Sequence, residues 1–227
     1  MKQMPPTLVI SLDFELAWGS FDKVYGKELL ECARWTHDVG VPVLLSHLSR
    51  TNLSATWATV GLTMLDRLAP VDDLTEVSYP HFPKPWFEFI PKQATEAEAP
   101  EWFGASVLRQ IREATPHQEI GFHSWSHVIF GDPGTPRERA RQELERCAAL
   151  SKQLGFAAES FVFPRNSVAH LDILREVGFK CYRSEDHMRY ASLTPPRARS
   201  ISGVAADFLG LTPIVVQPFI RDGLVAI

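Results

Sequence analysis

Two histidines four residues apart are the first feature of this sequence that could do chemistry. His123 and His127 lie in the segment GFHSWSH, directly after a short apolar run. Two imidazoles at this spacing can bind a divalent metal ion. On spacing alone, an ordinary pair of exposed or helix-capping histidines is the commoner interpretation. The metal interpretation therefore needs further ligands at the same place.

Other polar residues follow two further apolar segments. Asp13 and Glu15 come directly after the run 7–12, and Arg165 follows the segment 159–164. Alone, the two acids could be a helix cap with a solvated neighbour, and the arginine an ordinary salt-bridge partner. In a protein with parallel strands, however, ligands bind where the carboxyl ends of the strands meet. The three groups together therefore predict a metal site at that edge.

Strand-like and helix-like segments alternate along the chain. Strands are expected in the apolar or threonine-rich segments 7–12, 54–61, 119–123, 159–164 and 180–184. Helices are expected at 26–49 with an interruption at Pro42, and at 104–114, 135–155 and 168–179. This alternation predicts a parallel sheet wrapped by helices.

The helix after the turn at 131–136 has the clearest boundaries. Thr135 is expected at its N-cap, Pro136 at its first position and Gly155 at its C-terminal end. Its charged face is expected to be solvated. The residues at helical spacing that should face the core are Ala140, Leu144, Cys147, Ser151 and Leu154.

Residues 71–103 interrupt the alternation and are expected to form an insertion or lid. The acidic stretch 95–101 is predicted to be its most mobile part. Large apolar side chains are rarely left in water, so the aromatic residues of the insertion should form a wall over the metal site. These aromatic residues are Tyr79, Phe82, Trp86, Phe87 and Phe89.

Composition excludes some classes of protein. The net charge is −4 without any basic block, so nucleic acid is not an expected partner. The apolar run near the N-terminus is too short for a secretory leader, and no run approaches the length of a membrane span. We expect residues 1–227 to form a single cytoplasmic domain, and the sequence leaves its oligomeric state open.

The segments VISLDFELAWG, EIGFHSWSH and FVFPRN, in this order, resemble the motifs of the polysaccharide deacetylase family. This family is the NodB-homology domain of carbohydrate esterase family 4. The likeness runs from about residue 7 to about 185, and HSWSH matches its most specific motif, H-[ST]-x-x-H. It implies a distorted, incomplete (β/α) barrel that uses one divalent metal ion, commonly zinc, to remove N-acetyl or O-acetyl groups from glycans.

The resemblance also implies a role for each site residue. Asp13 matches the general base, and Arg165 matches the arginine that orients the base. Phe14 stands where the family has a metal-binding aspartate, so Glu15 is expected to bind the ion beside the two histidines. The physical chemistry agrees, because two imidazoles and one carboxylate leave an open position for a water on the ion.

Trp18 and Trp125 are each adjacent to one of these segments. Either side chain could stack on a sugar ring, and packing in the core is an equal alternative.

The family's late histidine, which protonates the leaving amine, has no match in residues 201–227. Two histidines that precede this segment, His170 and His187, remain as alternatives, and both are expected at the surface. Water or Asp13 could replace the missing acid, the chain could be truncated, or activity could have been lost.

Three functions stay open from the sequence. The first is deacetylation of a glycan or glycan precursor. The second is hydrolysis of a small non-sugar amide or cyclic imide on the same metal site. The third is a degenerate domain that binds glycan without turnover, which the missing histidine allows.

Overall fold

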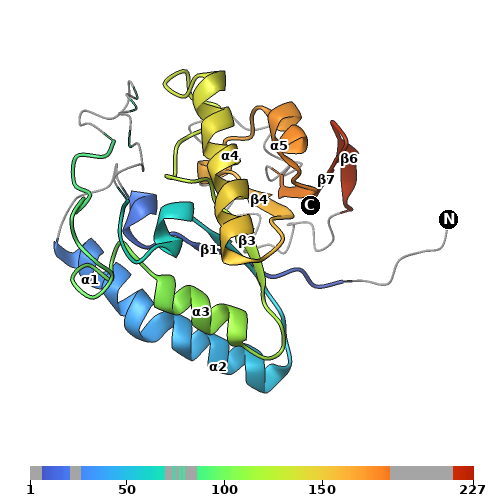
Figure 1. The fold of residues 1–227 in the computed structure, drawn as a ribbon. Coiled ribbons are helices and arrows are strands. Elements are labelled where there is room, and N and C mark those ends of the chain that lie inside the picture. The colour runs from blue at the N-terminus through green and yellow to red at the C-terminus, as the bar shows by residue number, and fades with distance from the viewer. Residues whose placement is uncertain are drawn as a thin grey trace, which may run out of the picture.

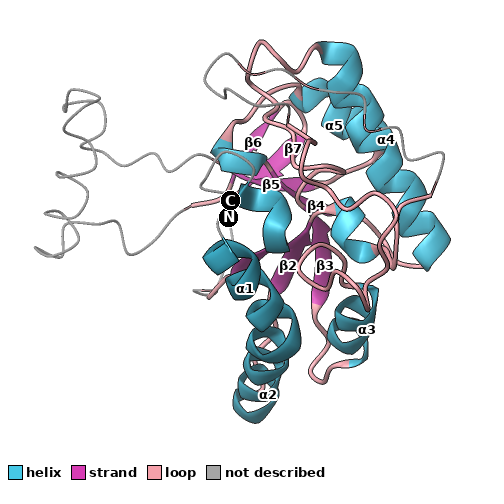
Figure 2. Ribbon diagram, turned by 90° about the vertical axis from the view of Figure 1, so that its left-hand side faces the viewer, coloured by secondary structure: helices cyan, strands magenta, loops and turns pink. Residues whose placement is uncertain are grey.

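A curled, mostly parallel β-sheet forms the centre of the protein, and Figure 2 shows the helices arranged around it. The computed structural model describes residues 7–20, 27–69, 74, 77, 79, 86–184 and 217–227. In this part of the chain the sheet order is β1-β2-β3-β4-β5-β7-β6, and only β6 runs antiparallel to its neighbour. The strands are β1 (Ser11–Phe14), β2 (Thr56–Thr59), β3 (Glu119–Phe122), β4 (Ser160–Val162), β5 (Cys181–Arg183), β6 (Phe219–Arg221) and β7 (Leu224–Ala226).

The α-helices follow the strands in the alternation that the sequence predicts. They are α1 (Lys27–Trp35), α2 (Val41–Thr51), α3 (Ala105–Glu113), α4 (Arg137–Leu154) and α5 (Leu171–Val177). Helix α3 lies beside α2, and α5 lies beside α4 (Figure 1). No helix in the described part of the chain combines the length and the apolar character needed to cross a membrane.

The curvature of the sheet follows from a contact between strands that are not neighbours. Three strands separate β1 from β5 in the sheet order, and in a flat sheet the two would lie about 19 Å apart, at about 4.8 Å per strand. Yet Arg183 at the end of β5 lies 2.7 Å and 2.8 Å from the two carboxylate oxygens of Asp13 in β1. The sheet therefore curls without closing, which confirms the expected incomplete (β/α) barrel.

An aromatic cluster fills the space between the sheet and helices α4 and α5. The ring centroids of its pairs lie 4.8–6.2 Å apart, mostly edge to face, the arrangement that aromatic quadrupoles favour. Its members are Phe122, Phe130, Phe156, Phe161, Phe163, Phe179 and Tyr182.

The predicted helix 26–49 is α1 and α2 joined by one π-helical turn, Thr36–Gly40. Pro42 lies in the first turn of α2. The N–H groups of a first turn have no acceptor within their helix, so α2 loses no hydrogen bond there through the N–H that proline lacks. The interruption therefore precedes the proline instead of lying at it.

Helix α4 differs from its prediction at the N-terminus. Pro136 occupies the N-cap position without a side-chain capping bond, and the Thr135 hydroxyl lies 2.8 Å from Tyr79 Oη instead. The prediction that Thr135 caps the helix is wrong, because a buried tyrosine uses that hydroxyl. At the other end Gly155 adopts φ 73°, a left-handed conformation suited to glycine, and ends α4 as expected.

The sequence prediction did not include the hairpin of β6 and β7. Its turn places Asp222 at φ 54° and Gly223 at φ 81°. Asp-Gly with two positive φ angles is the strongest short signal for a tight hairpin turn. The dipeptide was therefore sufficient to predict this element.

The insertion 71–103 contributes several large side chains to the core in the part that the structure describes. Tyr79, Trp86 and Phe87 are at most 2% exposed, and Phe89 is partly buried against the core. Phe82 lies outside the described residues. The prediction that these aromatic side chains avoid water is confirmed for the residues in view.

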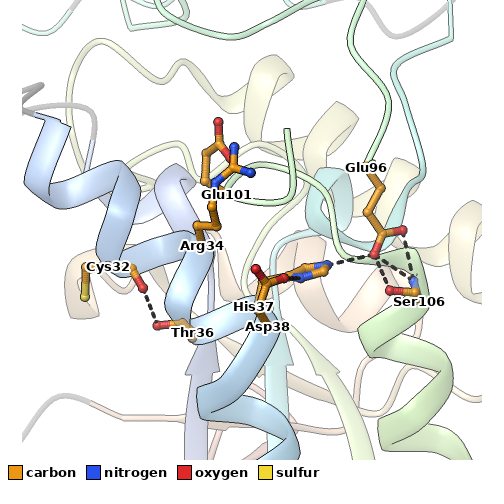
Figure 3. Close-up of polar contacts among 8 residues, drawn as sticks. All are labelled: Cys32, Arg34, Thr36, His37, Asp38, Glu96, Glu101 and Ser106. Atoms are coloured by element: carbon orange, nitrogen blue, oxygen red, sulfur yellow. Dashed lines mark hydrogen bonds and ion pairs between the residues drawn. The ribbon is translucent and has the colours of Figure 1, made fainter. Parts of the chain in front are cut away.

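The prediction that 95–101 is mobile is wrong. Glu96 and Ala99 are buried, and the Glu96 N–H donates to the Asp66 carbonyl at 2.6 Å. Figure 3 shows the Glu96 carboxylate between His37 and Ser106, whose N–H at the start of α3 donates to both carboxylate oxygens. A negative charge at a helix N-terminus is stabilising, so the acidic stretch serves as an anchor.

Tyr79 connects the insertion to the loop before α4. The Ile129 N–H donates to Tyr79 Oη at 2.9 Å, and Thr135 Oγ1 lies 2.8 Å away. Burial raises the pKa of Tyr79 to about 12, although both hydrogen bonds act in the opposite direction. The hydroxyl therefore keeps its proton at neutral pH, and it accepts the Ile129 N–H while it shares a hydrogen bond with the Thr135 hydroxyl.

We expect Tyr79→Phe to lower the free energy of unfolding by about 1–3 kcal/mol, because the buried Ile129 N–H loses its acceptor. Urea unfolding measures this loss. Tyr182→Phe is the matched control, since the buried Tyr182 hydroxyl has no hydrogen-bond partner within the described ranges, and it should change stability by less than about 0.5 kcal/mol. Equal losses in the two variants would contradict the role of Tyr79.

Candidate metal centre

Three of the predicted site residues meet at the carboxyl edge of the sheet. Glu15 follows β1, and His123 and His127 follow β3. Glu15 Oε2 lies 3.1 Å from His123 Nε2 and 3.0 Å from His127 Nε2. One ligand atom from each residue lies within 4.8 Å of the others. This group could hold a metal ion.

The contacts of His123 are those expected of a metal-binding histidine. Its Nδ1 lies 2.8 Å from the Val162 carbonyl oxygen, which can only accept a hydrogen bond. Nδ1 therefore carries the proton, and in the neutral ring Nε2 presents a lone pair to the Glu15 carboxylate. Two acceptors facing each other at 3.1 Å repel unless a positive charge lies between them. The bond to Val162 also orients the ring, as carbonyl groups commonly do for metal-binding histidines.

The charge states that the site favours are those that metal binding requires. Burial lowers the pKa of His127 below its usual value, although hydrogen bonding with Glu15 opposes the shift. Burial alone would raise the pKa of Glu15, but hydrogen bonding with His123 and His127 and the charges of the two rings lower it below the usual range. The two shifts favour the carboxylate form of Glu15 and the neutral form of the His127 ring, which are the forms that bind cations.

The backbone around the site is held in an uncommon conformation. Five non-glycine residues in the loops after β1, β3 and β4 have left-handed φ angles. Each such residue costs on the order of 1–3 kcal/mol, and persists only where the surrounding structure enforces it, as is frequent at active sites. They are Leu16 (47°), Ser124 (62°), His127 (59°), Arg165 (57°) and Asn166 (52°).

Gly19 provides the space that the Glu15 carboxylate occupies. A Cβ atom at this position would lie 1.9 Å from Glu15 Oε1 and 2.1 Å from its Cδ. Any other residue there would displace the carboxylate. The sequence analysis did not identify Gly19, and its proximity to Glu15 in the sequence was the only available indication.

The predicted base Asp13 is paired with an arginine other than the one that the resemblance implied. Both Asp13 carboxylate oxygens accept hydrogen bonds from the Arg183 guanidinium, which also lies 3.4 Å from Ser11 Oγ. Arg165 follows β4, and its positive charge contributes to the lowered pKa of His127. The structure thus pairs Asp13 with Arg183, while the charge of Arg165 acts on His127.

The two tryptophans are packed in the protein interior. Trp18 is fully buried, and its indole N–H donates to the Trp102 carbonyl at 2.7 Å. Trp125 is 5% exposed and packs against Gly61. Neither ring presents a face to a sugar, so the packing alternative describes both, and the stacking alternative is wrong for this conformation.

His170 is half-buried and precedes α5, and His187 lies outside the described residues. Within the ranges that the structure describes, Asp13 is the only candidate that we can assign for delivering a proton to a leaving group.

No family model and no curated protein matches the sequence. Among solved structures, the fold is similar to that of a protein assigned as a polysaccharide deacetylase from Mycobacterium smegmatis. The TM-score is 0.52 at 16% sequence identity, over 78% of this chain and 50% of that one.

Two further solved structures are more distant in fold. The Streptococcus pyogenes deacetylase PplD has a TM-score of 0.44 at 11% identity, over 78% of this chain and 55% of that one. The BpsB deacetylase domain from Bordetella bronchiseptica has a TM-score of 0.45 at 16% identity, over 78% of this chain and 63% of that one. The chain thus spans less than two thirds of the length of these proteins. At such identities the similarity shows the fold alone, that of the polysaccharide deacetylases.

We expect the protein to bind one Zn²⁺ or Co²⁺ ion per chain and His123→Ala to abolish this binding, since the ring lies beside both other ligand atoms. Isothermal titration with each ion measures stoichiometry and affinity. His47→Ala, in an exposed position on α2, is the matched control and should bind the ion normally. Unchanged affinity in His123→Ala would rule out this ligand set.

Gly19→Ala tests the position of Glu15 without removing a ligand. The added methyl group meets only the mobile end of that side chain, so the fold should persist while the carboxylate moves. We expect metal affinity to fall by about tenfold or more and the melting temperature to stay unchanged. Wild-type affinity in a folded Gly19→Ala protein would show that Glu15 does not bind the ion.

Proposed function

We propose that the protein is a metal-dependent hydrolase that removes an acetyl group from an N-acetylated or O-acetylated glycan or glycan precursor, with zinc as its metal. The observation that carries the proposal is the convergence of the Glu15 carboxylate and two imidazole nitrogens on one point at the carboxyl edge of the barrel. The fold shared with polysaccharide deacetylases supports the choice of reaction and substrate class.

A divalent ion at this point would polarise the acetyl carbonyl and make a bound water more acidic. The three candidate ligands follow β1 and β3 and already converge without an ion, so the reacting groups would meet a preorganised site. The reaction consumes one water and the amide or ester bond and yields acetate and the free amine or alcohol.

Asp13 supplies the base in this proposal. Arg183 fixes the plane of its carboxylate through two hydrogen bonds and balances its charge, while each oxygen keeps a second lone pair for a proton. Asp13 takes the proton from the attacking water and returns it to the leaving nitrogen, so one carboxylate acts as base and then as acid. This assignment accounts for catalysis without the late histidine.

Asp13→Asn should keep metal stoichiometry and lower acetate release by about 10²–10⁴-fold, because an amide cannot accept the proton. Acetate release from acetylated oligosaccharides, measured beside hydrolysis of cyclic imides, tests the reaction and the substrate class together. Hydrolysis of the imides alone would favour the non-sugar amide alternative. One bound metal per chain with no hydrolysis of any substrate would favour a non-catalytic glycan-binding domain.

The two arginines can be distinguished by matched substitutions. Arg183→Met should lower kcat by about tenfold or more and leave KM and metal affinity unchanged. The substitution removes both hydrogen bonds that hold the Asp13 carboxylate, and it changes no side chain proposed to bind the metal. Arg165→Met should affect kcat less. A larger loss of kcat in Arg165→Met, with normal turnover in Arg183→Met, would show that Arg165 orients the base, as the resemblance implied.

A further inference from the structure

Helix α4 carries a buried carboxylate directly against the loop between the two histidines. Glu143 is 1% exposed. Its Oε2 accepts the N–H groups of Trp125 at 3.0 Å and Ser126 at 2.8 Å. Its Oε1 accepts the Ser126 hydroxyl at 2.6 Å and lies 3.0 Å from Arg139 Nη2. The expectation that the charged face of α4 is solvated is therefore wrong at Glu143 and Arg139.

The position of His127 depends on this loop more than that of His123 does. His123 continues the β3 ladder through its N–H, which donates to Thr59, and its ring is fixed by Val162. The His127 ring has no corresponding bond, because its buried Nδ1 lacks a hydrogen-bond partner among the described residues. Outside its contacts with Glu15 and the His123 ring, the direction of the His127 ring therefore depends on its backbone.

That backbone has no regular secondary structure to hold it. Residues 124–127 belong to no helix or strand, and Ser124 and His127 both have left-handed φ angles. Such a loop relaxes unless other contacts enforce its shape. Between these two residues, the consecutive N–H groups of Trp125 and Ser126 both end on one Glu143 oxygen.

We propose that Glu143 is a positioning residue of the metal centre, which rests on the proposed function. By accepting two consecutive N–H groups and the Ser126 hydroxyl, it fixes the loop so that His127 Nε2 faces Glu15. Glu143 also forms an ion pair with Arg139, one turn earlier on the same helix, and the proposed positioning role is separate from this pair. Replacement of groups that orient metal ligands typically costs 10–100-fold in metal affinity or activity.

The test compares Glu143→Gln with Glu145→Gln on the same helix. Glu145 is exposed and lies 3.9 Å from Arg141, so its substitution controls for the loss of one negative charge on α4. The first measurement is amide hydrogen exchange of Trp125 and Ser126 in metal-free protein, followed by NMR. The second is Zn²⁺ affinity by competition titration with a chelator.

In Glu143→Gln, exchange of the Trp125 and Ser126 amides should accelerate by about tenfold or more, and the Kd for Zn²⁺ should rise by about 10–100-fold. Glu145→Gln should change neither quantity. Unchanged exchange and unchanged affinity in Glu143→Gln would overturn the proposal.

A double variant, Arg139→Met with Glu143→Gln, separates positioning from stability. It removes the buried guanidinium that Glu143→Gln leaves without its carboxylate, so it should fold even if the single variant does not. Fast amide exchange and weak Zn²⁺ binding in a stable double variant support positioning. Wild-type values would show that the ion pair alone mattered. If the wild-type protein binds no Zn²⁺, the proposed function and the metal-positioning role both fail, while amide exchange still shows whether Glu143 holds the loop.

Discussion

The curvature of the parallel sheet is the constraint on which the site depends. Parallel strands send their carboxyl ends to one edge, but a flat sheet would spread those ends over a distance that no side chain spans. Curling brings the end of β5 against β1, so that Arg183 reaches Asp13 with both guanidinium nitrogens. The same curvature gathers Glu15 and the two histidines at the rim. The residues with proposed roles therefore lie on strand ends and on the loops that follow them.

The site combines several features that are unfavourable in isolation. A carboxylate and two imidazole rings are packed against one another, and left-handed φ angles recur in the loops after β1, β3 and β4. Each is maintained by a contact outside the ligand set: Val162 orients His123, Gly19 leaves room for Glu15, and Glu143 holds the loop before His127. The arrangement of the three candidate ligands thus depends on groups that are not themselves candidate ligands.

Convergence of Glu15 with the histidines could be predicted from the sequence, because apolar runs mark the strands and polar residues follow them directly. The choice of Arg183 over Arg165 could not, since it depends on how tightly the sheet curls. Proximity of Trp125 to the histidines did not show which way its ring points. Glu143 was more accessible to prediction, because it lies three residues after Ala140 and four before Cys147, on the buried stripe of α4.

The bond between Asp13 and Arg183 joins residues 170 positions apart. During synthesis, a nascent chain that has reached the end of α4 already contains the carboxylate and both imidazoles of the candidate metal centre. The proposed base, Asp13, still lacks its guanidinium partner until β5 is made and the sheet has curled. The candidate metal ligands and the paired Asp13 are therefore completed at different times during synthesis. An unfinished or proteolytically shortened protein that ends before β5 would contain the candidate ligands without the guanidinium that pairs with Asp13.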